Sequence, residues 1–329
     1  MPSSGQILGI SNAIVDVLSH VDDSFLDELG ASKGSMTLID ETRARQIYDM
    51  MGPATEMSGG SVANTIAGIA SLGGNAAYIG RVADDQLGAI FAHDMRSLGV
   101  DVRLPPTADG APTARCYVFI TPDGQRTMQT FLGACTELNA DDLHARTIGN
   151  PAVILFEGYV LDTPDGQRTF DQTLKIAEAH GSDIALSLSD AECVARHRST
   201  FLDAIEHHVR LVVADDSEAI SLFEVASLEA AVNRSAELDC IFALTRSANG
   251  SVIVSGEQKI IQDAYPVAEV TDTTGAGDAY AAAFLFGWAA GKTLAECADL
   301  GSYAGAVVIQ QIGARLEPSV FADNPAFRI

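Results

Sequence analysis

Four short apolar segments, separated by longer amphipathic ones, constrain the fold of this chain more than any other feature. They cover residues 152–156, 184–188, 211–214 and 241–245. Such segments are typical of strands that are buried on both faces of a parallel sheet. With 329 residues, 47% of them hydrophobic, the chain can bury one large core. We therefore expect one domain over residues 1–329, an α/β fold with a doubly wound, mostly parallel sheet and helices on both faces.

Two glycine turns lead directly into helices. Gly275 and Gly277 precede an apolar helix that carries Asp278 in its first turn, and Gly59-Gly60 precede a second helix with Asn64 one turn in. Because a helix start carries free N–H groups and partial positive charge, it attracts anions. A carboxylate beside such a site suits abstraction of a hydroxyl proton during phosphate transfer. Either turn alone is equally well an ordinary helix start, but the pair indicates a shared ligand site.

A hairpin is predicted in the first half of the chain. Residues 116–120 and 126–131 are strand candidates on either side of the turn Pro122-Asp123-Gly124. Because these strands are partly polar, we expect them to lie outside the parallel sheet. A hairpin of this type can act as a lid that excludes water from a reaction site.

Composition limits the partners and the compartment. A formal net charge of −24 repels nucleic acids and acidic membranes, so we expect neither as a partner. The five cysteines are scattered and form no Cys-x-x-Cys pair, which favours reduced thiols in a cytoplasm. We see no signal peptide at the N-terminus, and the longest apolar run, residues 279–291, is too short to span a bilayer.

Two motifs resemble those of one enzyme family. Residues 272–278 read Asp-Thr-Thr-Gly-Ala-Gly-Asp, and Gly59-Gly60 with Asn64 are followed by Gly80-x-Val82-x-x-Asp85-x-x-Gly88. Together they resemble the PfkB (ribokinase-like) family of carbohydrate and nucleoside kinases. Within it, the segments 9–16, 25–26, 157–161 and 186–189 look most similar to the adenosine kinase branch.

The resemblance implies a ribokinase-like fold and a reaction. A small β-sheet lid would be formed by about residues 12–20, 34–40 and 111–133, beside the α/β core. The chain would use ATP and Mg²⁺ to move the γ-phosphate of ATP to a primary hydroxyl. The adenosine kinase likeness makes this the 5′-OH of adenosine, giving AMP in purine salvage.

The resemblance also assigns roles around the acceptor. Asp278 would be the catalytic base, and the N–H groups of Gly275, Ala276 and Gly277 would form the anion hole. Arg126 would close on phosphate from the lid. The ribose hydroxyls would be held by Asn12, Asp16, Gly60 and Asn64. The apolar walls around a purine would be Met36, Leu38, Met128 and Tyr159, each of which could instead be simple core packing.

A second set of residues would serve ATP and metal ions. The ATP side would be formed by Thr245, Ser247, Gly250, Gly275 and Gly277. Glu218 would hold Mg²⁺ through water. A monovalent cation, expected to be K⁺, would be bound by Asp272, Thr274, Val308, Gln311 and Gly313. The chain departs from the family pattern at Ala83 and Ser247, where the family has glycine, and at Asp215, where it has asparagine.

Other functions remain open at this point. A sugar kinase of the same family, acting on ribose, fructose or 2-keto-3-deoxygluconate, would use the same catalytic residues. A non-catalytic nucleoside-binding protein could also use this scaffold. A dinucleotide-binding oxidoreductase is disfavoured, because Tyr280 stands where Gly-x-Gly-x-x-Gly requires its third glycine. No Walker-type P-loop occurs, and both a monomer and a homodimer are compatible with the sequence.

Overall fold

A nine-stranded sheet forms the centre of the computed structural model, which describes residues 5–316. β13 runs antiparallel to both of its neighbours, and the other strands pair in parallel. The strands, in their order across the sheet, are β14 (Gln258–Gln262), β13 (Ser251–Ser255), β12 (Ile241–Thr245), β11 (Val209–Asp215), β10 (Asp183–Ser187), β9 (Val153–Glu157), β1 (Ile7–Ile10), β5 (Ala76–Ile79) and β6 (Asp101–Val102). The four apolar segments of the sequence are β9, β10, β11 and β12, so the expected parallel sheet is confirmed.

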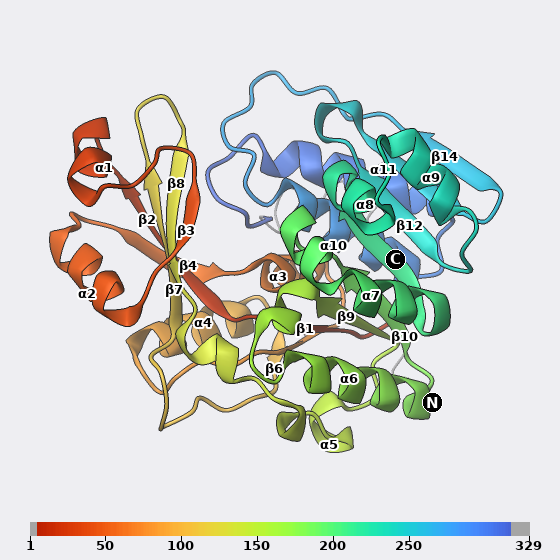
Figure 1. Cartoon of the computed structure of the whole chain (residues 1–329), viewed down its shortest axis with the longest axis horizontal. Coiled ribbons are helices and arrows are strands. Elements are labelled where there is room, and N and C mark those ends of the chain that lie inside the picture. Colours follow the sequence, from red (N-terminus) through yellow and green to blue (C-terminus); the bar gives the residue numbers. More distant parts are fainter. Residues whose placement is uncertain (1–4, 317–329) are drawn as a thin grey trace.

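Helices cover both faces of this sheet (Figure 1). Along β9, Val153 and Leu155 belong to one core cluster, whereas Ile154 and Phe156 belong to the other. The first cluster is covered by α3 (Ser61–Ser71), α4 (Gln86–Ser97), α10 (Ala276–Ala289) and α11 (Leu294–Val308). The second is covered by α5 (Ala145–Ile148), α6 (Gly166–His180), α7 (Ala191–His207), α8 (Asp216–Phe223) and α9 (Leu228–Ser235). Short 3₁₀ turns are η1 (Gly133–Glu137), η2 (Ala140–Asp142), η3 (Gly158–Asp162) and η4 (Ser247–Asn249).

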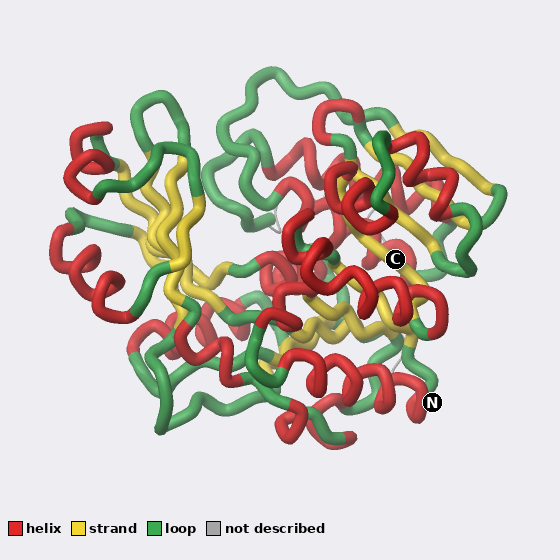
Figure 2. Tube along the Cα trace, viewed as in Figure 1, coloured by secondary structure: helices red, strands yellow, loops and turns green. Residues whose placement is uncertain are grey.

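A second, smaller sheet stands apart from the large one (Figure 2). Its strands, in order, are β3 (Met36–Leu38), β8 (Arg126–Phe131), β7 (Ala114–Ile120), β2 (Ile14–His20) and β4 (Thr55–Gly59). β7 and β8 form the predicted antiparallel hairpin. β4 was not expected, because its five residues show no apolar alternation and end in a glycine that reads as the start of a turn.

The two faces of the small sheet have different neighbours. Val15, Val17, Tyr117 and Phe119 point into the core cluster that also holds the buried faces of α1 (Asp23–Leu29) and α2 (Glu41–Met50). The opposite face carries a row of paired apolar residues across four strands. In that row Leu18 pairs with Val118, Val118 with Met128, and Met128 with Met36. Within residues 5–316, α1 and α2 pack on the first face, whereas Leu18, Val118 and Met128 of the second face line a cavity.

The helix α10, which follows the Gly275-Gly277 turn, is buried on every side beyond its first turn. Residues 279–287 of α10 are all buried, against α3 and α11. Tyr280 donates a hydrogen bond from its hydroxyl to Ser251 Oγ at 2.9 Å, which ties the first part of α10 to β13. The five cysteines are buried free thiols. Within residues 5–316, no helix has the length and apolar character needed to cross a bilayer.

Candidate active site

The start of α10 is open to a ligand. Gly275, its N-cap residue, has φ +75°, and no side chain within residues 5–316 caps the helix. A Cβ at Gly275 would lie 2.4 Å from Cβ of Ala314, so this position requires glycine for conformation and for space. Gly277, by contrast, is exposed, and no atom that the structure describes lies within 4 Å of where a Cβ would stand. An uncapped helix start with open space in front fits an anionic phosphate group.

Asp278 is held in place by the other glycine-turn helix. Its Oδ1 accepts a hydrogen bond from Ser61 Oγ at 2.7 Å, and its Oδ2 accepts one from Asn64 Nδ2 at 3.0 Å. Burial raises the pKa of Asp278, and these two hydrogen bonds and the charge of Arg315 oppose the rise. The two glycine turns thus meet at one carboxylate, although the residues lie more than two hundred positions apart in the chain. Ser61 was not expected, although it directly follows Gly60.

A cavity lies between Asp278's neighbours and the small sheet. It is lined on the polar side by Asp16, Asn64, Arg126, Thr274 and Arg315, and on the apolar side by Leu18, Met57, Cys116, Val118 and Met128. The carboxylate of Asp16 packs so closely on Gly59 that a Cβ there would lie 2.3 Å from it. Burial raises the pKa of Asp16 to about 6, against the charges of Arg315 and Arg126.

Two buried amide oxygens at this site have no partner within the described residues. They are Oδ1 of Asn12 and Oδ1 of Asn64, and their residues are only 5% and 8% exposed. An unpaired buried acceptor is costly unless a ligand or water donates a hydrogen bond to it. Gly60, between them, is the N-cap of α3 and has φ +94°. The structure therefore brings four of the sequence-predicted acceptor residues to one place.

A buried glutamate behind the site was not predicted. Glu157, at the end of β9, is 1% exposed and accepts hydrogen bonds from the backbone N–H groups of Asn12 at 2.9 Å and Val62 at 3.2 Å. Burial raises the pKa of Glu157 to about 7, and those N–H bonds oppose the rise. It fixes the end of β1 relative to the start of α3. The signal in the sequence was a lone carboxylate directly after an apolar strand.

Arg126 bridges the small sheet and the segment before α10. Its guanidinium forms an ion pair with Asp272, which also accepts from the backbone N–H of Gly313 at 2.7 Å and of Thr274 at 3.0 Å. Asp272 is 7% exposed. Both residues carry sequence-based roles, as a lid arginine and as a cation ligand. The structure joins them to each other, so a positive charge already faces the carboxylate expected to bind a cation.

The residues predicted to surround a purine divide into two groups. Met128 lines the cavity, and Met36 and Leu38 continue the same face of the small sheet with 50% and 58% exposure. Tyr159 lies elsewhere, packed against the core cluster on the other side of the large sheet. Its hydroxyl donates to Asp190, and burial together with that bond raises the pKa of Tyr159.

Comparison with known proteins identifies the family. The model of the "pfkB family carbohydrate kinase" matches residues 50–319, most of the chain. This chain belongs to the PfkB family.

Individual relatives of this PfkB kinase carry two kinds of name. The structure described as adenosine kinase from Sinorhizobium meliloti is 46% identical, with a TM-score of 0.89 over 97% of this chain and 99% of that one. A probable sugar kinase from Rhizobium etli is 44% identical, with a TM-score of 0.90 over 100% of both chains. Fructokinase-1 of Zea mays is 27% identical over 69% of this chain and 72% of its own. The family and its ribokinase-like fold are thus established, while the names divide over the acceptor.

The residues expected on the ATP side form the connection between β12 and β13. Thr245 ends β12, and Gly250 packs so closely on the backbone that a Cβ would lie 2.0 Å from Gln262 O. Ser247, which replaces a family glycine, has φ +50°. A serine in this left-handed region is strained, so the backbone keeps the conformation that a glycine would adopt freely. Ser251, bonded to Tyr280, places this turn next to α10.

Glu218 and Asp215 form a helix-capping box at the start of α8. Asp215 accepts from Glu218 N at 2.8 Å, and Glu218 Oε2 accepts from Asp215 N at 2.9 Å. Burial raises the pKa of Glu218 to about 8. Aspartate can cap the helix as well as asparagine does, which explains why this departure leaves the local structure intact. One oxygen of Glu218 remains for a water of Mg²⁺, so its role there stays a prediction.

The expected monovalent cation site is formed by neighbouring backbone segments. The carbonyl of Ile309 accepts from the N–H groups of Thr271 at 2.8 Å and Asp272 at 3.2 Å, which places residues 308–313 beside Asp272. Thr274 and Gly313 contact the Asp272 carboxylate through their N–H groups. The positions of Val308 and Gln311 in this segment are compatible with the expected carbonyl ligands. Oxygen-only ligation would fit a hard cation.

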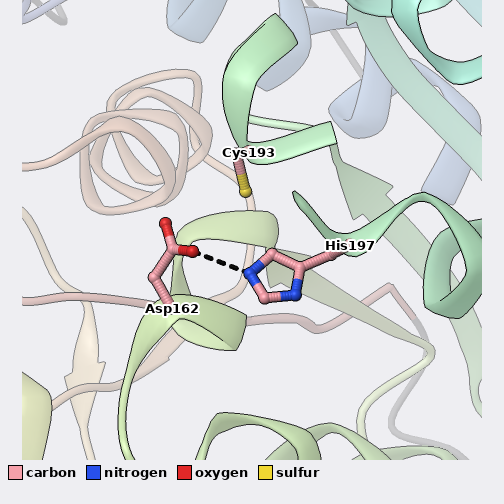
Figure 3. Close-up of side chains that lie close together, drawn as sticks. All are labelled: Asp162, Cys193 and His197. Carbon is pink, nitrogen blue, oxygen red and sulfur yellow. Dashed lines mark hydrogen bonds and ion pairs between the residues drawn. The ribbon is translucent and has the colours of Figure 1, made fainter. Parts of the chain in front are cut away.

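A separate polar cluster joins η3 to α7 (Figure 3). Asp162 of η3 and Cys193 and His197 of α7 bring possible metal-ligand atoms within 4.8 Å of one another. However, Asp162 accepts hydrogen bonds from His197 Nε2 at 2.7 Å and, through both oxygens, from Arg196 at 2.9 and 2.6 Å. Burial raises the pKa of Cys193 to about 12, so its thiol is neutral. We interpret this group as an ion-pair cluster that joins η3 to α7.

Proposed function

We propose that this PfkB kinase transfers the γ-phosphate of ATP to a primary hydroxyl, with Asp278 as the base. The observation that supports this most is the position of Asp278, at the uncapped start of α10 and held by Ser61 and Asn64 from α3. Phosphoryl transfer needs little covalent chemistry from the protein, because it depends on positioning and on stabilising charge. The N–H groups of Gly275, Ala276 and Gly277 would stabilise the transferring phosphate, while Asp278 accepts the hydroxyl proton.

Adenosine is the acceptor that we favour, through its 5′-OH. The polar end of the cavity offers Asp16 and the unpaired oxygen of Asn64, and Asn12, with a second unpaired oxygen, lies beside Gly60. These groups suit the hydroxyls of a ribose. The opposite wall is apolar, with Leu18, Val118 and Met128 on the second face of the small sheet. A purine base buries its apolar faces against such a wall, whereas a bare sugar has no comparable group.

Sugar kinases of the family are the alternative, with ribose, fructose or 2-keto-3-deoxygluconate as acceptor. The same polar groups would hold sugar hydroxyls, and the names of the relatives include sugar kinases. Under this alternative, the exposed Met36 and Leu38 would be covered by a second copy of the chain, giving a homodimer instead of a monomer. A nucleoside-binding protein without catalytic activity is the alternative of a different class, and the presence of Asp278 argues against it.

The cofactors follow from the proposed reaction. ATP with Mg²⁺ is the general expectation for kinases of this family, and K⁺ is our proposal for the segment around Asp272. Because Arg126 already pairs with Asp272, K⁺ would have to bind while that guanidinium turns toward phosphate. Replacing KCl by choline chloride at constant ionic strength tests this, and unchanged turnover would rule out a required monovalent cation.

A cytoplasmic location is compatible with five reduced thiols.

A panel of acceptors decides between the alternatives. ADP release is measured with adenosine, inosine, ribose, fructose and 2-keto-3-deoxygluconate at fixed ATP and Mg²⁺. We expect kcat/KM to be largest for adenosine. Met128→Ala should lower it about tenfold for adenosine, because roughly 1–2 kcal/mol of apolar contact is lost, and leave any turnover of ribose unchanged. Turnover of sugars alone would show that the chain is a sugar kinase, and binding without turnover of any acceptor would refute the kinase proposal.

A further inference from the structure

Arg315 occupies a position in the acceptor cavity that the roles given above do not explain. It lies directly after Gly313 and Ala314, on the segment that leads away from α11. Its Nη2 donates to the carbonyl of Ser58 at 2.6 Å and to Ser58 Oγ at 2.7 Å, and its Nη1 donates to the carbonyl of Ala63 at 3.1 Å. The side chain thus connects β4, the first turn of α3 and the segment beside the anion hole.

Arg315 forms no ion pair with a described residue. Among the described residues, no carboxylate oxygen comes within the 4.0 Å limit of a salt bridge to its guanidinium. Its acceptors are a hydroxyl, two backbone carbonyls and, at 3.9 Å, the sulfur of Met95, and they fix the guanidinium without neutralising it. A partly buried guanidinium that is held by neutral groups keeps a positive potential on its surroundings.

The carboxylates around this guanidinium belong to the acceptor site. Burial raises the pKa of both Asp16 and Asp278, and the positive charge of Arg315 lowers both pKa values. Asp94 of α4 also faces it, through Ser58, whose N–H donates to Asp94 Oδ2 at 2.9 Å. Two further charged groups lie nearby. The charge of Asp278 raises the pKa of Glu157 on β9, and the charge of Arg126 on β8 lowers the pKa of Asp16. Among residues 5–316, the negative groups named here outnumber the positive ones, and the charge of Arg315 lowers the pKa of Asp278 against the effect of burial.

We propose that Arg315 is a positioning residue for phosphoryl transfer, whose fixed positive charge keeps Asp278 ionised and therefore able to accept the hydroxyl proton. This inference rests on the proposed kinase function. The same three hydrogen bonds hold Ser58 and Ala63 on either side of the Gly59-Gly60 turn, so they also keep α3, with Ser61 and Asn64, in register with Asp278. Proton transfer requires the unprotonated base, so loss of the charge should act on the turnover step more than on the binding of ATP.

The test compares Arg315→Met and Arg315→Lys with the wild type, using the best acceptor of the panel. We expect Arg315→Met to lower kcat at pH 7 at least tenfold and to move the acid limb of the kcat profile toward higher pH, with the KM for ATP unchanged. Arg315→Lys keeps a charge and should recover part of both effects. Arg103→Met is the control, because Arg103 also donates to backbone carbonyls, at Thr147 and Ile148, but pairs with Asp101 and lines a different cavity. It should leave the pH profile unchanged.

An acid limb of Arg315→Met that superimposes on that of the wild type would overturn the inference, whatever its turnover. If the wild type itself shows no turnover, the proposed kinase function is wrong. The effect of the Arg315 charge is then measured as the change in stability to urea between pH 5 and pH 8. Removing Arg315 should destabilise the fold more at pH 8, where the neighbouring carboxylates are charged, than at pH 5. A loss of stability that does not vary with pH would leave only a structural role. If Arg315→Met does not fold, Arg315→Lys and Arg315→Gln give the same comparison.

Discussion

Two polar clusters of this protein are each built around aspartate side chains but have opposite electrostatics. The acceptor cluster of Asp16, Asn64, Glu157 and Asp278 contains carboxyl groups whose pKa values are raised by burial, and an amide oxygen with no partner among the described residues. In the ion-pair cluster the pKa of Asp162 lies below its ordinary value. Burial alone would raise this pKa, but the hydrogen bonds and charges of Arg196 and His197 outweigh the effect of burial. In the ion-pair cluster the carboxylate is paired with cationic side chains, whereas the acceptor cluster keeps buried carboxyl groups and an unpaired amide oxygen.

This difference separates a site that stabilises the fold from one that is prepared for a ligand. A satisfied ion pair with a lowered carboxyl pKa contributes to stability. Buried carboxyl groups with raised pKa values and unpaired acceptors lower stability, and they are retained where chemistry needs them. Asp162, Cys193 and His197 look like a metal site by residue type alone, as Figure 3 shows. Their hydrogen-bond partners, not their identities, argue against that function.

Asp278→Asn gives the largest expected effect. Without a base, kcat should fall by roughly 10²–10⁴-fold, as is usual for loss of general base catalysis. The fold should be as stable as the wild type or more so at pH 8, because a buried charge is removed. Turnover assays and thermal unfolding measure both. Loss of activity that is accompanied by a lower melting temperature would mean that Asp278 is structural and that the two clusters do not differ.

Glu157→Gln tests the same contrast through pH. Because the folded pKa of Glu157, about 7, lies above its ordinary value of 4.5, the folded state binds its proton more readily than the unfolded state. The charged form therefore lowers stability as pH rises from about 4.5 through 7. The variant, which mimics the protonated form, should resemble the wild type at pH 5 and gain relative stability toward pH 8, by at most about 3 kcal/mol. Urea unfolding across this range measures the difference, and a constant difference contradicts the prediction.

The sequence predicted the elements of the fold better than the geometry of the acceptor cluster. Strong local patterns identified β9 to β12, the hairpin of β7 and β8, and the two glycine turns. β4 has no such pattern, because it is held by its pairing with β2 and not by its own residues. The resemblance assigned Asp278 and Asn64, but no periodicity indicates that Ser61, Glu157 and Arg315 meet them. Contacts of this kind depend on how α3, α10 and residues 313–315 pack, which is a tertiary property.

Asn64→Ala removes one member of the acceptor cluster and should have a moderate effect. It deletes the donor to Asp278 Oδ2 and the unpaired Oδ1 that we assign to a substrate hydroxyl. We expect KM for the acceptor to rise about tenfold, because one buried hydrogen bond to ligand is worth roughly 1–2 kcal/mol. Asn139→Ala is a suitable control, since Asn139 caps η2 outside the site. A variant of Asn64 with unchanged KM and kcat would show that the unpaired oxygen does not meet the substrate.

Asp162→Asn should have the smallest effect, and of the opposite kind. The side chain is 29% exposed, so solvent screens its pairs, and we expect a loss of about 1 kcal/mol in stability and a melting temperature lower by roughly 2 °C. Because the folded pKa of Asp162 lies below its ordinary value of 3.8, its contribution is fully present above that pH and is lost as the pH falls further. The variant should therefore be less stable than the wild type at both pH 5 and pH 8, while kcat/KM changes less than about twofold. A large loss of turnover in a folded Asp162→Asn protein would make this cluster part of the functional machinery and remove the contrast between the two.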